Sequence, residues 1–456
     1  MDVTVVDGGL AGRLAELGAG TLWVVYHNYS ALAQAKVVPA ARAADVATGG
    51  VSFARANWDF AITDEQRAHP GFGADSGDFR VIPDPATLTA LPHRPGVAQA
   101  YGWLVDDGGP WAGDPRARLR DQVAHLTRLG FTARMAFEAE FALLQRGATG
   151  DLEPADHGRM FTIDEVEARW AWSTRLLDGL AGAGVPVHQL AREYGAGQYE
   201  VSLLPAGPVE AADRFLLLRQ LVRALARDDG LVATFMPKPR TDLPGNGLHV
   251  HLSLVGPDGS EAIPDPVTDG LSAVGEAAIA GLLAHADGLA GLVAPTPNSY
   301  RRLQPGSWAP AHRCWGVGNR AALVRVPGRG AGRHLEFRLA DASANPYLLA
   351  TGLLAAVADG VERQIPLPPP VEIDVGHASD DEARALGAAR LPRGPEEAVA
   401  ALVADPVLLG ALGPVIAEHY PPMKLFEAEL CRAAAPADAG PATVTAWERH
   451  AYLEHV

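Results

Sequence analysis

The sequence predicts an α+β protein, in which short strands and amphipathic helices are interspersed along 456 residues. Within residues 134–144, the apolar Phe137 and Phe141 alternate with charged neighbours, as in a strand with one buried face. Within residues 115–129, leucines and a valine recur every three to four positions, as on one face of a helix. Hydrophobic residues make up 48% of the chain, which is enough to fill the cores of two or three domains.

A small α+β unit is expected at the start of the chain. Its helix covers residues 10–17, and a proline-rich passage at 92–95 ends the pattern and marks a boundary. We therefore predict two domains, residues 1–100 and 101–456. The strands expected in the first domain cover residues 21–26, 33–38, 49–64 and 78–83.

The second domain is predicted to contain most of the helices. Its first helix begins where Asp114 can cap the N-terminus and Pro115 suits the first helical position, and it ends near residue 129. Residues 366–389 are rich in proline and aspartate and are expected to form a loop. Further helices are expected over residues 166–183, 210–228, 271–293, 346–359, 395–403, 406–420 and 444–453. Strands are expected over residues 98–105, 134–144, 199–204, 231–236, 248–255 and 336–339.

Composition narrows the classes of function. The formal net charge of −16 argues against a general nucleic-acid binder, because a polyanion would have to approach a protein of its own sign. Cys314 and Cys431 offer neither a disulfide framework nor a zinc spacing, so a reducing, cytoplasmic environment is expected. We see no signal-peptide pattern and no membrane span, since the longest apolar run, residues 278–295, is interrupted by His285 and Asp287.

One stretch, residues 298–336, reverses the local sign of charge. Between Asp287 and Glu336 there is no acidic residue and no lysine. The stretch suggests an anion site, because arginine presents a planar fork of donors suited to carboxylate and phosphate. A solvated basic surface loop is the alternative. The arginines of this stretch are Arg301, Arg302, Arg313, Arg320, Arg325, Arg329 and Arg333.

Several predicted strands place polar residues two apart, and therefore on one face of the strand. Carboxylates so close repel one another unless a cation holds them ionised. A set dominated by carboxylates suits Mg²⁺ or Mn²⁺ better than zinc. For each pair taken alone, a polar sheet face in water is the alternative, and the two histidines could be structural. The pairs are Glu138 and Glu140, Gln198 and Glu200, His249 and His251, and Glu336 and Arg338.

Acidic metal ligands facing arginines describe a site for a phosphoryl group and a carboxylate together. No Walker-type GxxxxGK[ST] motif is present, and no GxGxxG motif follows a predicted strand. Any nucleotide is therefore expected to be held in another way.

These motifs, taken in order, resemble the glutamine synthetase family over essentially the whole chain. The resemblance implies a small N-terminal β-grasp domain and a larger catalytic domain built on an antiparallel sheet with flanking helices. It also implies a homo-oligomer, usually a dodecamer of two hexameric rings, with sites between adjacent subunits. The matching stretches are FEAEF at 137–141, EYGAGQYE at 193–200, GNGLHVHLS at 245–253, NSYRRLQPGSWAP at 298–310, GNRAALVRVP at 318–327 and EFRLADASANPYL at 336–348.

The resemblance assigns metal ligands at the matching positions, and with them Mg²⁺ or Mn²⁺ and ATP. Glu140, Glu193 and Glu200 match the ligands of a metal near the substrate amino acid. Glu138, His249 and Glu336 match the ligands of a second metal, which bridges the ATP phosphates.

The resemblance also assigns binding and catalytic roles. Arg302 and Arg338 match the pair that binds the glutamate α-carboxylate and the acyl phosphate. Gly245 lies in the loop that accepts the substrate amino group, where Glu140 is also expected to contribute. The residues expected to stabilise the transferred phosphoryl group or to contact ATP are Arg320, Arg325, His251, Ser253 and Arg333.

The chain departs from the family pattern where ammonia binds. Members that use ammonia typically read PG[YF]EAP after the arginine motif, and Trp308 replaces that glutamate here. In the N-terminal segment, Ala54 occupies the position of an aspartate that serves ammonium, although Asp59 lies close by in sequence. Losing both carboxylates removes the charge that attracts NH₄⁺, while an indole can contact an alkyl or aryl group or a cation. We therefore expect an ATP-dependent glutamate–amine ligase, with Trp308 contacting an organic amine.

Two alternatives remain. One is a glutamine synthetase that uses ammonia, with Trp308 serving only as loop packing. The other is a catalytically inactive, ring-forming homologue, which all six candidate metal ligands argue against. Smaller departures are Pro244 in the substrate loop and His334 at a position where a second basic residue near ATP is common. No tyrosine lies within residues 366–390, so adenylylation is not expected.

Overall fold

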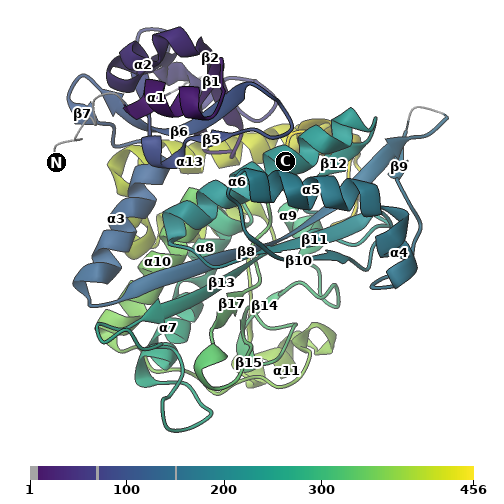
Figure 1. The fold of residues 1–456 in the computed structure, drawn as a ribbon. Coiled ribbons are helices and arrows are strands. Elements are labelled where there is room, and N and C mark those ends of the chain that lie inside the picture. The colour runs from purple at the N-terminus through teal and green to yellow at the C-terminus, as the bar shows by residue number, and fades with distance from the viewer. Residues whose placement is uncertain (1–8, 68–70, 149–150) are drawn as a thin grey trace.

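The computed structural model describes residues 9–67, 71–148 and 151–456, whose strands form two large sheets packed with helices (Figure 1). The predicted α+β class is confirmed. The predicted element bounds hold within a few residues for most elements. The exceptions have identifiable physical causes, given below.

The first sheet contains seven strands, five of them in the order β2–β1–β6–β4–β3. Strands β1 and β6 run parallel, whereas their outer neighbours pair antiparallel. This mixed sheet with two short helices fits the grasp-like N-terminal domain. Its elements are α1 (Gly9–Glu16), β1 (Thr21–His27), β2 (Ala33–Pro39), α2 (Ala43–Gly49), β3 (Val51–Ala54), β4 (Asp78–Pro83), β5 (Thr89–Ala90), β6 (Val97–Asp106) and β7 (Gly109–Pro110).

The strand predicted over 49–64 is wrong beyond Ala54, where the chain turns into a 3₁₀ helix, Arg55–Asp59. The turn carries Trp58 into an aromatic cluster, 5.2 Å from the ring of Trp111. The boundary predicted at residue 100 falls inside β6. Because β6 and β7 belong to the first sheet up to Pro110, we propose a boundary between Pro110 and Pro115.

The second sheet carries the polar pairs. Its strands follow the order β10–β11–β8–β13–β17–β16–β15 and pair antiparallel, except that β15 and β16 run parallel. The small strands β9 and β12 both pair with β8. The bounds are β8 (Thr132–Arg146), β9 (Leu152–Pro154), β10 (Val187–Arg192), β11 (Gln198–Leu203), β12 (Val232–Thr234), β13 (Leu248–Val255), β15 (Trp315–Val317), β16 (Val324–Val326) and β17 (Leu335–Phe337).

The apolar face of β8 is covered by a helix layer. Phe137, Ala139 and Phe141 are buried, and the ring of Phe137 lies 5.3 Å from that of Phe215 on α6. This packing leaves Glu138 and Glu140 on the opposite face. The helices are α3 (Pro115–Arg128), α4 (Ile163–Ala168), α5 (Trp170–Gly182), α6 (Pro208–Asp228), α7 (Ala273–Ala284), α8 (Ala286–Val293), α9 (Ser299–Arg302), α10 (Pro346–Arg363), α11 (Asp380–Ala385), α12 (Pro395–Val403), α13 (Pro406–Ala434) and α14 (Ala446–Tyr452). A separate two-stranded sheet pairs β14 (His312–Arg313) with β18 (Ala389–Arg390).

Two predicted helices are each broken into a pair. The helix expected over 271–293 bends by 72° at His285, whose imidazole bridges Asp359 at 3.0 Å and Asp405 at 2.6 Å. The helix expected over 166–183 breaks at Arg169, whose guanidinium donates to the carbonyl of Ala155. Both breaks depend on partners distant in sequence.

Three further predictions need correction. The loop expected over residues 366–389 contains helix α11, whose N-terminus is closed by a capping box of Ser379 and Glu382. β10 was not expected from the sequence, since its exposed and buried residues do not alternate. The helix expected over 406–420 is kinked at Gly413 and continues past Pro421 and Pro422 to Ala434. Its buried face continues through Lys424 and Glu427, which form an ion pair 3.0 Å long. That buried contact favours the longer helix.

The N-terminal domain is attached to the catalytic domain by its turn after β1. The amide of Asn345 donates to the carbonyl of Asn28 at 2.8 Å, and the ammonium of Lys424 donates to the hydroxyl of Ser30 at 3.1 Å. Buried Arg219 donates to the carbonyl of Ala31. These bonds satisfy turn groups that are removed from water.

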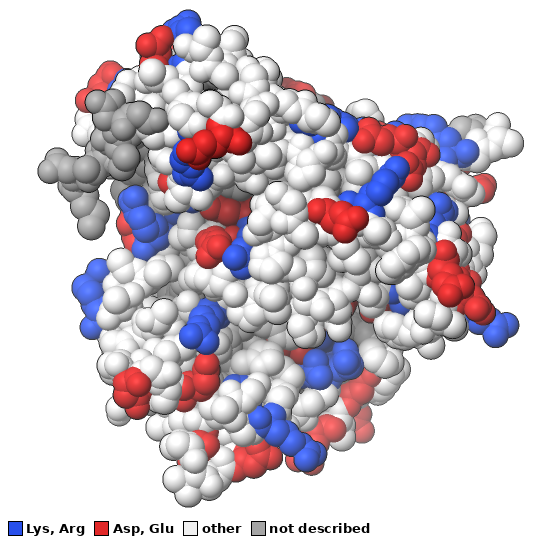
Figure 2. Space-filling view, viewed as in Figure 1, with Lys and Arg blue, Asp and Glu red and all other residues white. Residues whose placement is uncertain are grey.

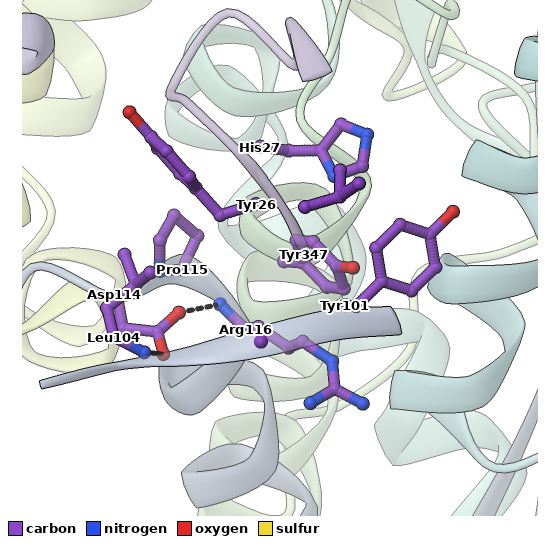
Figure 3. A pocket seen from close by; sticks show the side chains of 10 residues that line it. Tyr26, His27, Tyr101, Leu104, Asp114, Pro115, Arg116 and Tyr347 are labelled. Carbon is purple, nitrogen blue, oxygen red and sulfur yellow. Dashed lines mark hydrogen bonds between the residues drawn. The ribbon is translucent and has the colours of Figure 1, made fainter. Parts of the chain in front are cut away.

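A small cavity of about 10 Å³ lies at the same junction (Figure 3). Tyr26, His27, Tyr101 and Tyr347 line it together with Arg116. It has room for about one water molecule and none for a substrate. This cavity is therefore too small to be a substrate site.

No single helix among the described residues is long and apolar enough to cross a membrane. The bent pairs α7–α8 and α12–α13 meet that measure only when each pair is taken together.

Candidate active site

The register of the second sheet brings three of the predicted metal ligands into two adjacent rows. In one row, Glu138 of β8 lies between Ser202 of β11 and His249 of β13. In the other, Glu336 of β17 lies between His251 of β13 and Arg325 of β16. Residues from five strands thus meet on one face. Alternation within each strand predicts the face, whereas only pairing between strands creates the cluster.

Glu138 lies at the centre of this cluster. Its carboxylate accepts a hydrogen bond from the hydroxyl of Ser202 at 3.0 Å. It lies 3.2 Å from Nδ1 of His249 and 3.5 Å from Nε2 of His251. Ser202 was not predicted as a site residue. Its position two residues after Glu200, on the same strand face, is the signal that could have found it.

Glu336 is the most enclosed carboxylate of the cluster, since its side chain has 0% exposed surface. Arg325 donates to it at 2.6 Å, and Arg338 donates to its other oxygen. Nδ1 of His249 lies 3.7 Å away. Burial alone would raise the pKa of Glu336, but the charges of His249 and Arg338 outweigh burial and lower it to about 2. Glu336 is therefore ionised at neutral pH.

The pKa values of the other carboxylates are shifted in opposite directions. Burial would raise the pKa of Glu138, but the two imidazoles hold it well below its usual range. Burial, followed by the charges of Glu138 and Glu140, raises the pKa of Glu200 to about 9. Burial and Glu140 also raise the pKa of Glu193. Such crowding is favourable only when a cation is bound among the carboxylates.

Glu140 and Glu193 lie at the side of the cluster toward the substrate loop. Glu140 accepts a hydrogen bond from the backbone N–H of Gly247 at 2.8 Å, and it lies 3.9 Å from Nε2 of His249. Glu193 accepts from the backbone N–H of Tyr194 at 3.1 Å. The amide of Gln198 donates to the carbonyl of Gly245 at 2.9 Å and so holds the substrate loop beside them.

The guanidinium of Arg302 is held in place by backbone carbonyl oxygens. It donates to the carbonyls of Leu339 at 2.9 Å and Arg338 at 3.1 Å. A Cβ atom at Gly245 would lie 2.7 Å from Cγ of Arg302, so this approach requires glycine. The predicted pair of Arg302 and Arg338 is therefore brought together, with both side chains nearly buried.

The other predicted anion-binding residues lie in two different parts of the site. Arg320 is exposed, and its carbonyl accepts from Nε of Arg338 at 2.8 Å. Ser253, His251 and Arg333 line a cleft of about 390 Å³ that reaches Glu138. Arg333 is already engaged, because its guanidinium donates to the carbonyl oxygen of Asp269 at 2.9 Å. The cleft is large enough for the phosphates and sugar of a nucleotide.

Trp308 lies in an exposed loop. Its side chain is among the exposed large hydrophobic groups, at 73%, and its backbone has a φ of 63°. That left-handed conformation is uncommon for a bulky residue and is found mainly where a local geometry is fixed by function or packing. The preceding Ser307 donates to the carbonyl of Arg302 at 2.8 Å, which ties the loop to the arginine site.

Asp59 does not replace the aspartate that is absent at Ala54. Its side chain has 0% exposed surface and forms an ion pair with Arg67 at 2.6 Å. It also accepts from the backbone of Phe72. Ala54 itself is exposed. Among the described residues of this segment, no carboxylate is left free at the position expected for ammonium.

The donor set fits divalent cations. One donor atom each from Glu138, Glu200 and His249 lies within 4.8 Å of the others, and the same holds for Glu138, His251 and Glu336. Carboxylate-rich sets with few imidazoles suit Mg²⁺ or Mn²⁺. Burial, followed by the charge of Arg338, lowers the pKa of His249, although the neighbouring glutamates raise it.

Comparisons with known proteins agree with this geometry. The glutamine synthetase catalytic domain matches residues 112–443. The glutamine synthetase of Pyrococcus woesei is 33% identical over 392 residues, 86% of each chain. The gamma-glutamylpolyamine synthetase GlnA3 of Streptomyces coelicolor is 35% identical over 427 residues, 92% of each chain. The chain belongs to the glutamine synthetase family.

A solved structure of GmaS in complex with ADP shares the fold of this glutamine synthetase family member. The TM-score is 0.82 at 31% identity, over 97% of this chain and 98% of that one. The chain is thus an ATP-dependent carbon–nitrogen ligase of a family that uses divalent metals. The relatives include both a glutamine synthetase and an amine ligase, so family membership leaves the amine open.

The raised pKa of Glu200 gives a prediction for this glutamine synthetase family member. With a pKa of about 9, its carboxyl is protonated at pH 7.5 without metal, and a cation favours the ionised form. Binding of Mn²⁺ should therefore release a proton, and affinity should rise with pH up to about 9. Calorimetry in two buffers of different ionisation enthalpy measures the release. Glu200→Gln should release less, and equal release by both proteins would contradict the assignment.

Proposed function

We propose that this family member joins the γ-carboxylate of glutamate to an organic amine in two steps driven by ATP. First, a γ-carboxylate oxygen attacks the γ-phosphorus of ATP and ADP leaves, which gives γ-glutamyl phosphate. Next, the amine nitrogen attacks the acyl carbon and loses a proton, while phosphate leaves with the former carboxylate oxygen. The observation that carries the choice of amine is Trp308, in the loop where ammonia users have glutamate.

The carboxylates and imidazoles of the sheet hold the metal ions in this proposal. Bound Mg²⁺ or Mn²⁺ would neutralise charge on the phosphates. The ligand sets remain those predicted from the sequence. Four of their six members belong to the clusters around Glu138, although one cluster combines Glu200 with Glu138 and His249, which were predicted for the other ion. The sets are Glu140, Glu193 and Glu200 for one ion, and Glu138, His249 and Glu336 for the other.

The arginines orient the anions. Arg302 lies beside Gly245 and donates to the backbone of Arg338. A glutamate α-carboxylate held there would present its amino group to the backbone of the substrate loop and to Glu140. Arg325 and Arg320 are assigned to the transferring phosphoryl group. In other phosphoryl-transfer enzymes an arginine so placed contributes on the order of 10³–10⁵ in rate.

ATP is assigned to the cleft beside Glu138. His251, Ser253 and Arg333 line it, and it opens directly onto the metal-ligand row. A nucleotide placed there puts its phosphates next to the cluster and its sugar toward the outer part of the cleft.

An organic amine fits the acceptor side better than ammonium does. Ammonium is attracted by fixed negative charge, but Ala54 carries none and Asp59 is neutralised by Arg67. An indole instead offers apolar area and a π face to an alkyl, aryl or polyamine chain. The similarity to a gamma-glutamylpolyamine synthetase supports this choice.

The second candidate is a glutamine synthetase that uses ammonia. The comparable identity to the Pyrococcus woesei glutamine synthetase favours it. An inactive homologue is disfavoured, because every predicted ligand lies on the same sheet face or beside it.

We also propose a cytoplasmic homo-oligomer, a dodecamer of two hexameric rings. The large apolar side chains of Phe161, Ile163 and Trp170 are each more than half exposed in the single chain, as expected if a second copy covers them. Sedimentation velocity measures the assembly, and a monomer at micromolar concentration would contradict it.

The choice of amine can be tested by phosphate release with ammonium and with a panel of alkyl, aryl and polyamines. We expect an organic amine to have the highest kcat/KM. Trp308→Glu restores a carboxylate and should shift the ratio of kcat/KM toward ammonium by about tenfold, equivalent to about 1.4 kcal/mol. Trp308→Phe keeps an aromatic surface and is the matched control, with the ratio nearly unchanged. A wild-type kcat/KM for ammonium above that of every amine would refute the proposal.

A further inference from the structure

Tyr194 is a large aromatic residue that lies exposed beside the substrate loop, residues 244–247. It follows Glu193 in the turn between β10 and β11, and its side chain is 70% exposed. Its backbone N–H donates to the carboxylate of Glu193 at 3.1 Å, which ties the start of the turn to the site. The phenol ring has no part in the two reaction steps proposed above.

The turn that carries Tyr194 packs against the substrate loop. A Cβ atom at Gly195 would lie 2.5 Å from Cγ of Pro244, so the turn approaches the loop closely there. Gln198 holds this contact in place. Its Oε1 accepts from the N–H of Gly195 at 2.9 Å, and its Nε2 donates to the carbonyl of Gly245 at 2.9 Å. Tyr194 is thereby fixed next to the loop to which the glutamate amino group is assigned.

The Trp308 loop approaches the same substrate loop through Arg302. A Cβ atom at Gly247 would lie 2.8 Å from Nη2 of Arg302, and one at Gly245 would lie 2.7 Å from its Cγ. Ser307 donates to the carbonyl of Arg302 at 2.8 Å, and the indole that follows is 73% exposed. Two exposed aromatic side chains therefore come from two segments that both contact the substrate loop.

Exposed aromatic surface beside a reaction site favours a ligand that carries carbon. An alkyl chain can cover the apolar area of each ring, and full burial of one methylene group strengthens binding about fourfold. Figure 2 shows Asp and Glu side chains interspersed with Lys and Arg among the described residues of the face it draws. The residues described there form no broad acidic surface that could select an amine by its charge alone.

We propose that Tyr194 and Trp308 together contact the carbon chain of the amine, which makes Tyr194 a specificity-determining residue for amines with an extended chain. The inference rests on the proposed function and names the substrate class within it. The reacting nitrogen enters beside the substrate loop, and the chain extends along the two rings toward solvent. Methylamine has no chain to cover either ring, so it is a poor substrate.

The test measures kcat/KM by phosphate release for unbranched alkylamines from methylamine to pentylamine. We expect kcat/KM to rise about threefold per methylene group, because most of each added group is removed from water. Tyr194→Ala should lower the ratio of kcat/KM for pentylamine to that for methylamine by about tenfold, and Tyr194→Phe should keep it. A purely structural effect would lower both values and leave their ratio unchanged. Trp170 is an exposed aromatic residue on α5, so Trp170→Ala is the matched control, with an unchanged ratio.

A diamine distinguishes contact with the chain from contact with a distal charge. The molecule 1,5-diaminopentane has the carbon chain of pentylamine and a second ammonium group. Tyr194→Ala should lower kcat/KM for both amines by a similar factor, because the ring covers the chain that they share. A loss confined to the diamine would contradict the inference, since the ring would then act on the distal charge.

The outcomes separate this inference from the proposed function. A kcat/KM for ammonium above that of every amine would refute both. Preference for organic amines with a kcat/KM that is flat or falls with chain length would refute the inference alone. An unchanged ratio in Tyr194→Ala would also refute it, and sedimentation velocity would then show whether the ring belongs to a contact between copies. Because the side chain is mostly exposed, Tyr194→Ala is expected to fold.

Discussion

The candidate site depends on one buried carboxylate, that of Glu336, which must stay ionised. Glu336 is completely buried, and two arginines and an imidazole keep it ionised. Removing one such partner from a buried charge costs several kcal/mol, so the surrounding groups are not independent. Arg325 lies on β16 opposite Glu336, whereas Arg338 directly follows β17 in the chain. The cluster therefore depends on the pairing of β13, β17 and β16, and the arginine-rich stretch supplies its counter-charge.

The rest of the catalytic domain holds this register in place. α6 packs on the apolar face of β8, which directs Glu138 and Glu140 to the opposite face. Beyond β17, the chain passes Asp341, which is buried and accepts from the backbone of Ser343 at 3.0 Å. It then reaches Asn345, which bonds to the N-terminal domain. The site and the domain junction are thus connected by a few residues of buried backbone.

The sequence predicts much of this site because alternation within a strand is a local property. Glu138 and Glu140 fall on one face of β8 by period two, as Gln198 and Glu200 do on β11, whereas the pairing of the two strands brings Glu140 and Glu200 side by side. What could not be predicted depends on pairing between strands. Period two places Ser202 on the same face as Glu200, but its position opposite Glu138 follows only from the register of β11 against β8.

The contact of His251 with His334 and the helix break at His285 also join residues at least 74 positions apart. Local patterns carry no information about such partners. Trp308, in contrast, could be identified from the sequence alone, because it replaces a glutamate within a recognisable motif. Its exposure and left-handed backbone add only that the loop presents the indole outward.

The central claim is that this charge-balanced face transfers a phosphoryl group to a carboxylate before the amine reacts. The most direct measurement uses glutamate labelled with ¹⁸O in its γ-carboxylate, together with ATP, Mg²⁺ and the preferred amine. The account predicts that each phosphate released carries one oxygen from the labelled carboxylate, in step with amide formation. Amide formed with unlabelled phosphate would contradict it, because the phosphate oxygen would then have come from water.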